Sequence, residues 1–106
     1  MFAFLAAIIT VAVQDPSYDE AVRCAGLTQA ASELEGSESA RGKALFDASL
    51  YWSLTAGQKA ESAGRSAQAD ADQTRARMSA VRELAGDDAA ARAALETCLQ
   101  QTPNLG

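Results

Sequence analysis

Histidine is absent from the chain, and aromatic side chains are few. The 106 residues include one Trp, two Tyr and three Phe, whereas alanine alone occurs 25 times. Without an imidazole the chain has no His general base, no His to activate a serine nucleophile and no His metal ligand. The composition therefore excludes every catalytic or metal site that depends on histidine.

Basic residues are also too few for a nucleic-acid binder. Nine Lys and Arg stand against fourteen Asp and Glu, which gives a formal net charge of −5. No surplus of positive charge is available to neutralise phosphates. The acidic excess lies in residues 15–38, a pattern typical of a solvated surface and less often of a docking surface for a basic partner. The hydrophobic fraction of 48% excludes a compositionally disordered chain.

Catalytic and metal-binding motifs are missing as well. The sequence has no glycine-rich phosphate loop and no Gly-x-Ser-x-Gly turn. The acidic stretch 33–38 lacks the ligand spacing of a calcium loop. Asp70 and Asp72 are two positions apart, so a helix would point them about 200° away from each other. We therefore expect a protein that is not an enzyme, with no catalytic residue, no metal and no cofactor.

The N-terminal segment 1–14 carries no charged side chain, and its apolar run from Phe2 to Val13 is twelve residues long. A membrane-spanning helix needs about 20 residues, whereas the apolar region of a signal peptide has about 7–15. The sequence therefore predicts a cleaved signal peptide over 1–14, a helical domain over 15–106, and a periplasmic or secreted protein without membrane attachment. The alternative is a membrane-anchored accessory subunit that keeps residues 1–14.

The remaining chain alternates between helical periodicity and short breaks. Ser17 and Glu20 form a capping-box pattern, Gly36, Gly64 and Gly86 mark breaks, and Pro103 follows the last periodic segment. No sustained alternation indicates a strand. The pattern predicts an all-α protein, an antiparallel up-down-up-down bundle of four helices. The expected helices cover 17–34, about 40–62, about 67–85 after a Ser66 cap, and about 88–101 after an Asp87 or Asp88 cap.

The second expected helix has apolar residues on two faces. Leu45, Ala48, Trp52 and Ala56 form one stripe, and Phe46, Leu50 and Leu54 form another. A helix that is apolar on most sides is usually buried at the centre of a bundle. The other interpretation is that Phe46, Leu50 and Leu54 are an exposed interaction face, which would serve a protein partner or a homo-oligomer.

The other expected helices each have one packing face. These are predicted at Cys24, Leu27, Ala31 and Leu34 in the first helix, at Ala67, Ala71, Thr74, Met78, Val81 and Ala85 in the third, and at Ala91, Leu95, Cys98 and Thr102 in the fourth.

The two cysteines, Cys24 and Cys98, lie on the packing faces of the first and last expected helices. An up-down-up-down bundle makes these helices neighbours, and an even number of cysteines in an exported chain favours a disulfide. From residue 15 onward the large apolar side chains are few, so a cross-link would stabilise a marginal core. We predict a structural Cys24–Cys98 bond.

The function indicated by these features is a small exported interaction or structural module. A thiol-disulfide redox protein using Cys24 and Cys98 is an alternative, although the sequence has no Cys-x-x-Cys motif.

Overall fold

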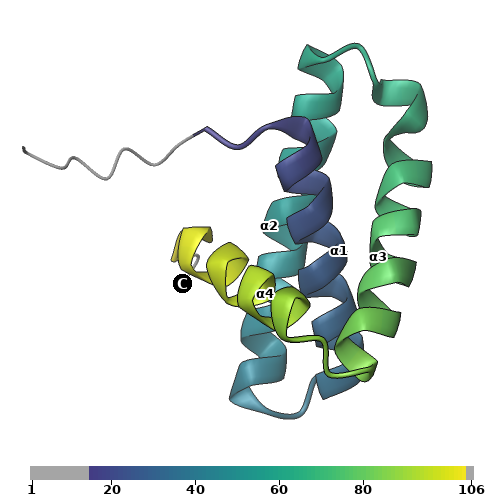
Figure 1. The fold of residues 1–106 in the computed structure, drawn as a ribbon. Helices are drawn as coiled ribbons and strands as arrows, with labels where there is room; N and C mark the ends of the chain where they lie inside the picture. The colour runs from purple at the N-terminus through teal and green to yellow at the C-terminus, as the bar shows by residue number, and fades with distance from the viewer. Residues whose placement is uncertain (1–14, 105–106) are drawn as a thin grey trace, which may run out of the picture.

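A computed structural model describes residues 15–104, and within this range the chain is all-α (Figure 1). Four helices follow one another, α1 (Tyr18–Glu35), α2 (Ala40–Ser62), α3 (Ala69–Ala85) and α4 (Ala89–Gln101), with a single 3₁₀ turn at Ser66–Gln68 before α3. The predicted fold class, four helices and no strand, is confirmed for these residues. The signal-peptide and membrane-anchor predictions fall on 1–14, outside the described residues. No helix within 15–104 is long and apolar enough to cross a membrane.

Side-chain caps fix three of the four helix starts. The Ser17 hydroxyl accepts from the backbone N–H of Glu20, and the Glu20 carboxylate accepts from the backbone N–H of Ser17, which completes the predicted capping box. Ser39 caps α2 through the N–H of Gly42, and Asp88 caps α4. Such caps satisfy backbone donors that no helix carbonyl can reach.

The prediction that Ser66 caps the third helix is wrong. Ser66 begins the 3₁₀ turn, and Gln68 precedes α3 without a side-chain cap. Asp88 and Arg92 stand at an i, i+4 spacing that favours an ion pair, but the two side chains do not pair. Asp88 uses its carboxylate for the α4 cap, and Arg92 pairs instead with Asp87, 3.1 Å away.

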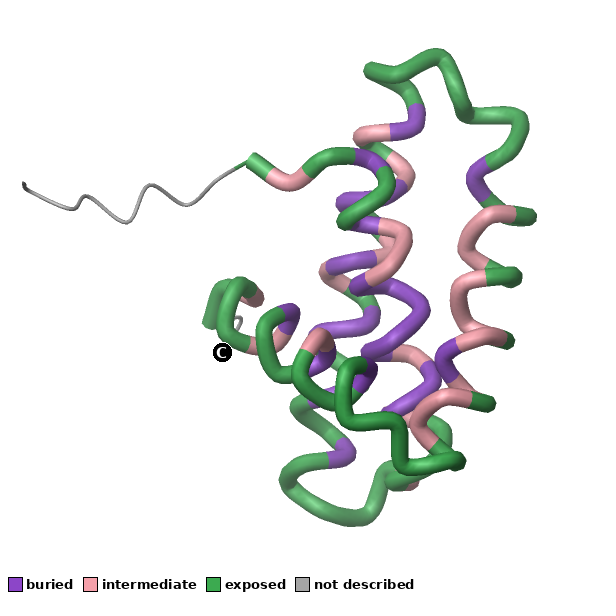
Figure 2. The backbone as a smooth tube through the Cα atoms, viewed as in Figure 1, coloured by how far each residue is buried: buried purple, intermediate pink, exposed green. Residues whose placement is uncertain are grey.

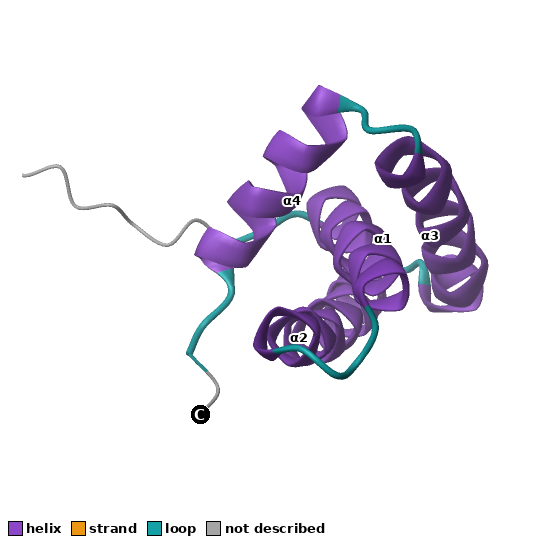
Figure 3. Cartoon of the chain, turned by 90° about the horizontal axis from the view of Figure 1, so that it is seen from below, coloured by secondary structure: helices purple, strands orange, loops and turns teal. Residues whose placement is uncertain are grey.

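The centre of the bundle is α1, not the second helix as its two apolar faces suggested. Seen along the bundle, α1 lies between α2 and α3, and α4 crosses it obliquely (Figure 3). Its residues from Cys24 to Thr28 are buried in succession, so it is enclosed on most of its circumference (Figure 2). Small side chains make this possible because they let three helices approach one backbone.

The packing face of α3 shares only Val81 with the predicted face. Ala67, Ala71, Thr74, Met78 and Ala85 are exposed, whereas Ala69 and Ala80 are buried. The buried side is made of small residues because the backbones are close. A Cβ atom built on Gly26 of α1 would lie 2.6 Å from the carbonyl carbon of Ala76 in α3. Of the larger apolar side chains of α3, Met78 is exposed, whereas Val81 and Leu84 are partly buried against the core.

Acids of the 15–38 segment pair with bases contributed by later parts of the chain. Within the described residues Asp15 pairs with Lys59, Asp19 with Arg65 and Glu33 with Arg77, whereas Arg23, the base of this segment, pairs with Glu83 of α3. Most of these groups are partly solvated, so each pair contributes about 0–1 kcal/mol. These contacts pair three of the six acids of the segment within the fold.

Candidate functional site

The disulfide between Cys24 and Cys98 joins the central helix to α4, as predicted, with the two Cα atoms 5.5 Å apart. Both residues are buried, at 6% and 3% exposure. Thiol–disulfide exchange needs an attacking thiolate to reach one of the sulfurs. Arg23, the charged neighbour of Cys24, is engaged by Glu83 through two hydrogen bonds of 3.1 Å. This environment favours a structural bond over a redox site.

The end of α4 rests against the largest buried side chain of the protein. Trp52 of α2 is 1% exposed, and its indole Nε1–H donates to Thr102 Oγ1 over 2.9 Å. Leu95 and Cys98 supply the buried side of α4, as predicted. The indole is therefore positioned to report whether α4 is docked.

The two apolar stripes of α2 have opposite environments. Leu45, Ala48, Trp52 and Ala56 are at most 2% exposed and form part of the core. Phe46, Leu50 and Leu54 are 52%, 49% and 69% exposed. We refer to Phe46, Leu50 and Leu54 as the outer face of α2. Because α2 lies at the edge of the bundle (Figure 3), this face looks away from α1.

Single exposed apolar residues are ordinary, but a row of them along one helix is less so. The other large exposed apolar side chains within the described residues are Leu34 on α1 and Met78 on α3, at 52% and 49%. Each stands alone on its own helix. The outer face of α2 thus has three of the five such side chains, at the i, i+4, i+8 spacing that a helical partner recognises.

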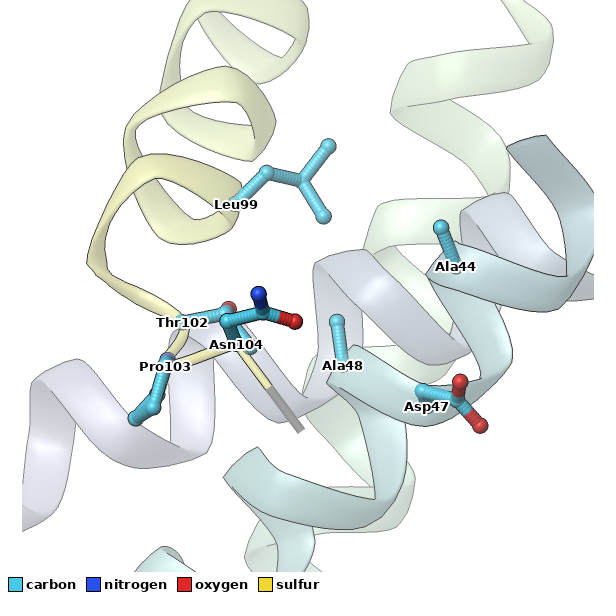
Figure 4. Close-up of a pocket in the computed structure, with 7 residues that line it drawn as sticks. All are labelled: Ala44, Asp47, Ala48, Leu99, Thr102, Pro103 and Asn104. Carbon is cyan, nitrogen blue, oxygen red and sulfur yellow. The ribbon is translucent and has the colours of Figure 1, made fainter. Parts of the chain in front are cut away.

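Two of the surface cavities formed by the described residues border both α2 and α4. The larger, about 410 Å³, opens between α2 and the end of α4, and Asp47 is its only ionisable side chain (Figure 4). Its other walls are Ala44, Ala48, Leu99, Thr102, Pro103 and Asn104. The smaller, about 210 Å³, lies where Leu34, Leu45, Leu84 and Leu95 converge, beside the Arg41–Glu96 ion pair.

A polar cluster ties the start of α1 to α3. The Tyr18 hydroxyl donates to Asp72 Oδ2 over 2.7 Å, and Asp72 also pairs with Arg75. The Arg65 guanidinium lies over the Tyr18 ring, 5.3 Å from its centroid. Burial, the hydrogen bond and the negative charge of Asp72 together raise the pKa of the Tyr18 phenol to about 12. Asp72 therefore faces α1.

The raised pKa of Tyr18 predicts a loss of stability at high pH. The unfolded chain releases the phenolic proton near pH 10, before the folded chain does. Stability should therefore fall as pH rises from about 10 through 12. Tyr18→Phe removes the hydrogen bond to Asp72, so its free energy of unfolding at neutral pH should be about 1 kcal/mol lower than that of the wild type. Because phenylalanine has no phenolic proton, the variant should not show the loss of stability between about pH 10 and 12 that Tyr18 causes. Urea unfolding of both chains across this range measures the difference; parallel pH profiles would contradict the assignment.

Among residues 15–104, no group of three or more His, Cys, Asp or Glu side chains is placed to hold a metal ion. The candidate site is therefore the outer face of α2, which is carried by a helical bundle that the Cys24–Cys98 disulfide cross-links. The chain matches no known family model, and no curated protein and no solved structure resembles it significantly.

Proposed function

We propose that the protein is a small exported helical module that works by binding, and that the outer face of α2 is its interaction surface. The observation that carries this proposal is the contrast within one helix between a fully buried stripe and an exposed stripe of Phe46, Leu50 and Leu54. Keeping three large apolar groups in water lowers solubility and contributes nothing to the core. A partner that covers them would recover the free energy of burying them.

Export is the second part of the proposal. An intramolecular disulfide persists in oxidising compartments, and the uncharged segment 1–14 has the length of a signal-peptide core. We infer a periplasmic or secreted location. Intact-mass measurement under non-reducing conditions tests both features together. A mature chain that begins near Val13 or Asp15 and lacks free thiols supports export, whereas a full-length chain recovered with membranes contradicts it.

A pair of matched variants tests the interaction role. Phe46→Glu with Leu50→Glu places two charges on the outer face of α2. Leu34→Glu with Met78→Glu places two charges at positions of similar exposure elsewhere. Since all four side chains are about half exposed, both variants should fold, with circular dichroism unchanged.

The native mass of each variant is then measured in the cell fraction that contains the protein. We expect the wild type and the Leu34/Met78 variant to elute in a complex, and the Phe46/Leu50 variant to elute as a monomer. If the Phe46/Leu50 variant keeps the native mass of the wild type, the outer face of α2 is not the interaction surface.

A further inference from the structure

We propose that the partner of the outer face of α2 is a second copy of this chain, packed through α2 in an antiparallel pair. This inference rests on the interaction role proposed for the same face. It is based on three features of α2: a glycine in the middle of the helix with open space above it, and a lysine and a glutamate that form no ion pair within the described residues.

Gly57 lies inside α2, where glycine is less favourable than alanine by about 1 kcal/mol. Other helical glycines have a local reason. A Cβ on Gly26 would meet Ala76, and a Cβ on Gly42 would meet the carbonyl oxygen of Gly36. A Cβ on Gly57 would meet nothing within 4 Å. The space above Gly57 is open, and it lies on the same side of the helix as Phe46 and Leu50.

Charges flank the apolar residues at the two ends of the same face. Lys43 precedes them and Glu61 follows them, and both are exposed. Within the described residues, every Lys and Arg except Lys43 and Arg82 forms an ion pair, and Glu61 has no ion-pair partner. At 100° per residue, Lys43, Leu50 and Glu61 project within about 20° of one another.

The outer face of α2 is self-complementary: a two-fold axis near the level of Trp52 would bring matching residues of two copies together. Lys43 and Glu61 are equally far from position 52 along the helix, and so are Leu50 and Leu54. An antiparallel copy would therefore bring Lys43 opposite the second copy's Glu61 at both ends, and Leu50 opposite its Leu54 at the centre. A two-fold dimer repeats each such contact, so a self-complementary patch is what it requires.

Phe46 and Gly57 complete the match. Phe46 lies six residues before the proposed axis and Gly57 five residues after it, on the same flank of the helix. The ring of Phe46 in each copy would therefore lie over Gly57 of the other, in the space that a side chain would fill. A single helix pair is smaller than a standard interface of roughly 800 Å² per partner, so we expect micromolar self-association.

Sedimentation of the purified chain, in the form that cells produce, tests the pairing. The wild type should associate to a dimer as its concentration rises. Lys43→Glu and Glu61→Lys should each weaken the dimer about tenfold, because each change creates two like-charge contacts per dimer. The double variant, which exchanges the two charges, should recover the affinity of the wild type to within about threefold.

The Gly57→Leu variant distinguishes this specific pairing from non-specific hydrophobic association. Leucine favours helix and meets open space, so the thermal midpoint of the isolated chain should not fall. The added side chain occupies the place of Phe46, so the dimer should weaken about tenfold or more. If the outer face associates merely because it is apolar, the same change strengthens association instead.

Three outcomes overturn the inference: a purified wild type that stays monomeric at the highest soluble concentration, a charge exchange without recovery, or a Gly57→Leu chain that dimerises more tightly. The proposed function is judged separately, by the native mass of the complex in the cell fraction. A monomer in purified form that runs in a larger complex there has a different protein partner. In that case the outer face of α2 is still an interaction surface, but its partner is not a second copy of this chain.

Discussion

Replacing both cysteines, Cys24→Ala with Cys98→Ala, is expected to lower the free energy of unfolding by about 4.5 kcal/mol. The bond closes a loop with a sequence separation of 74, and the chain-entropy model assigns this stabilisation to a loop of that length. For a domain of this size the thermal midpoint should fall by roughly 20 °C or more. The effect is large because alanine, the main residue of the core, buries little surface per side chain.

The same pair of substitutions should loosen α4 first. This helix packs less extensively than the other three, and the disulfide is its covalent connection to α1. Trp52 should then lose the cover of Thr102, and its emission should shift to longer wavelength below the main unfolding transition. Reduction of the wild type under mild denaturation serves as a second route to the same state. A loss of less than about 1 kcal/mol, with unchanged Trp52 emission, would contradict the structural role of the bond.

Gly26→Ala is expected to destabilise the protein by about 2–3 kcal/mol, although alanine is the better helix former. Its Cβ would lie 2.6–2.7 Å from three atoms of Ala76, two of them backbone atoms that cannot rotate away. The α1–α3 contact would have to separate, and small residues line that contact over several turns.

Gly57→Ala is the matched control, because it is the same chemical change in open space. Measured by thermal unfolding at low concentration, it should raise stability by about 0.5–1 kcal/mol. Opposite signs for the two variants support close α1–α3 packing. If Gly26→Ala also raises stability, the two helices are farther apart than the structure places them.

Helix positions in this protein are largely predictable from sequence, because local signals determine them. The Ser17–Glu20 capping box and the breaks near Gly36 and Gly86 correctly placed helix ends to within one or two residues. The Cys24–Cys98 pairing followed from helix order and from the face on which each cysteine lies. The start of α3 is the exception, since Ser66 opens a 3₁₀ turn.

Helix faces were harder to predict where alanine dominates. In α3 the larger residues Met78 and Val81 suggested a packing face. Val81 does pack against the core, but Met78 is exposed, and the side that approaches Gly26 is made of small residues such as Ala76 and Ala80. The same effect makes α1 the central helix, although α2 has the largest side chains. Periodicity ranks faces by hydrophobicity, whereas close packing of backbones ranks them by size.

The residues of the candidate interaction surface could be predicted from the sequence, but their exposure could not. Phe46, Leu50 and Leu54 were identifiable as a second stripe, but only the fold shows which stripe of α2 is exposed. Gly57, Lys43 and Glu61 were overlooked. A glycine in the middle of a helix and on the same side as an apolar stripe was the available signal, and it became informative once the space above it was known to be open.

The most direct test of the central claim, that the outer face of α2 is the interaction surface, is site-specific photocrosslinking in cells. A photoreactive amino acid replaces Leu54 in one chain and Met78 in another, both exposed apolar positions. The proposal predicts a discrete covalent adduct from position 54 and none from position 78, and an adduct of twice the chain mass identifies a second copy. No adduct at position 54, or equal yields at both positions, would contradict it.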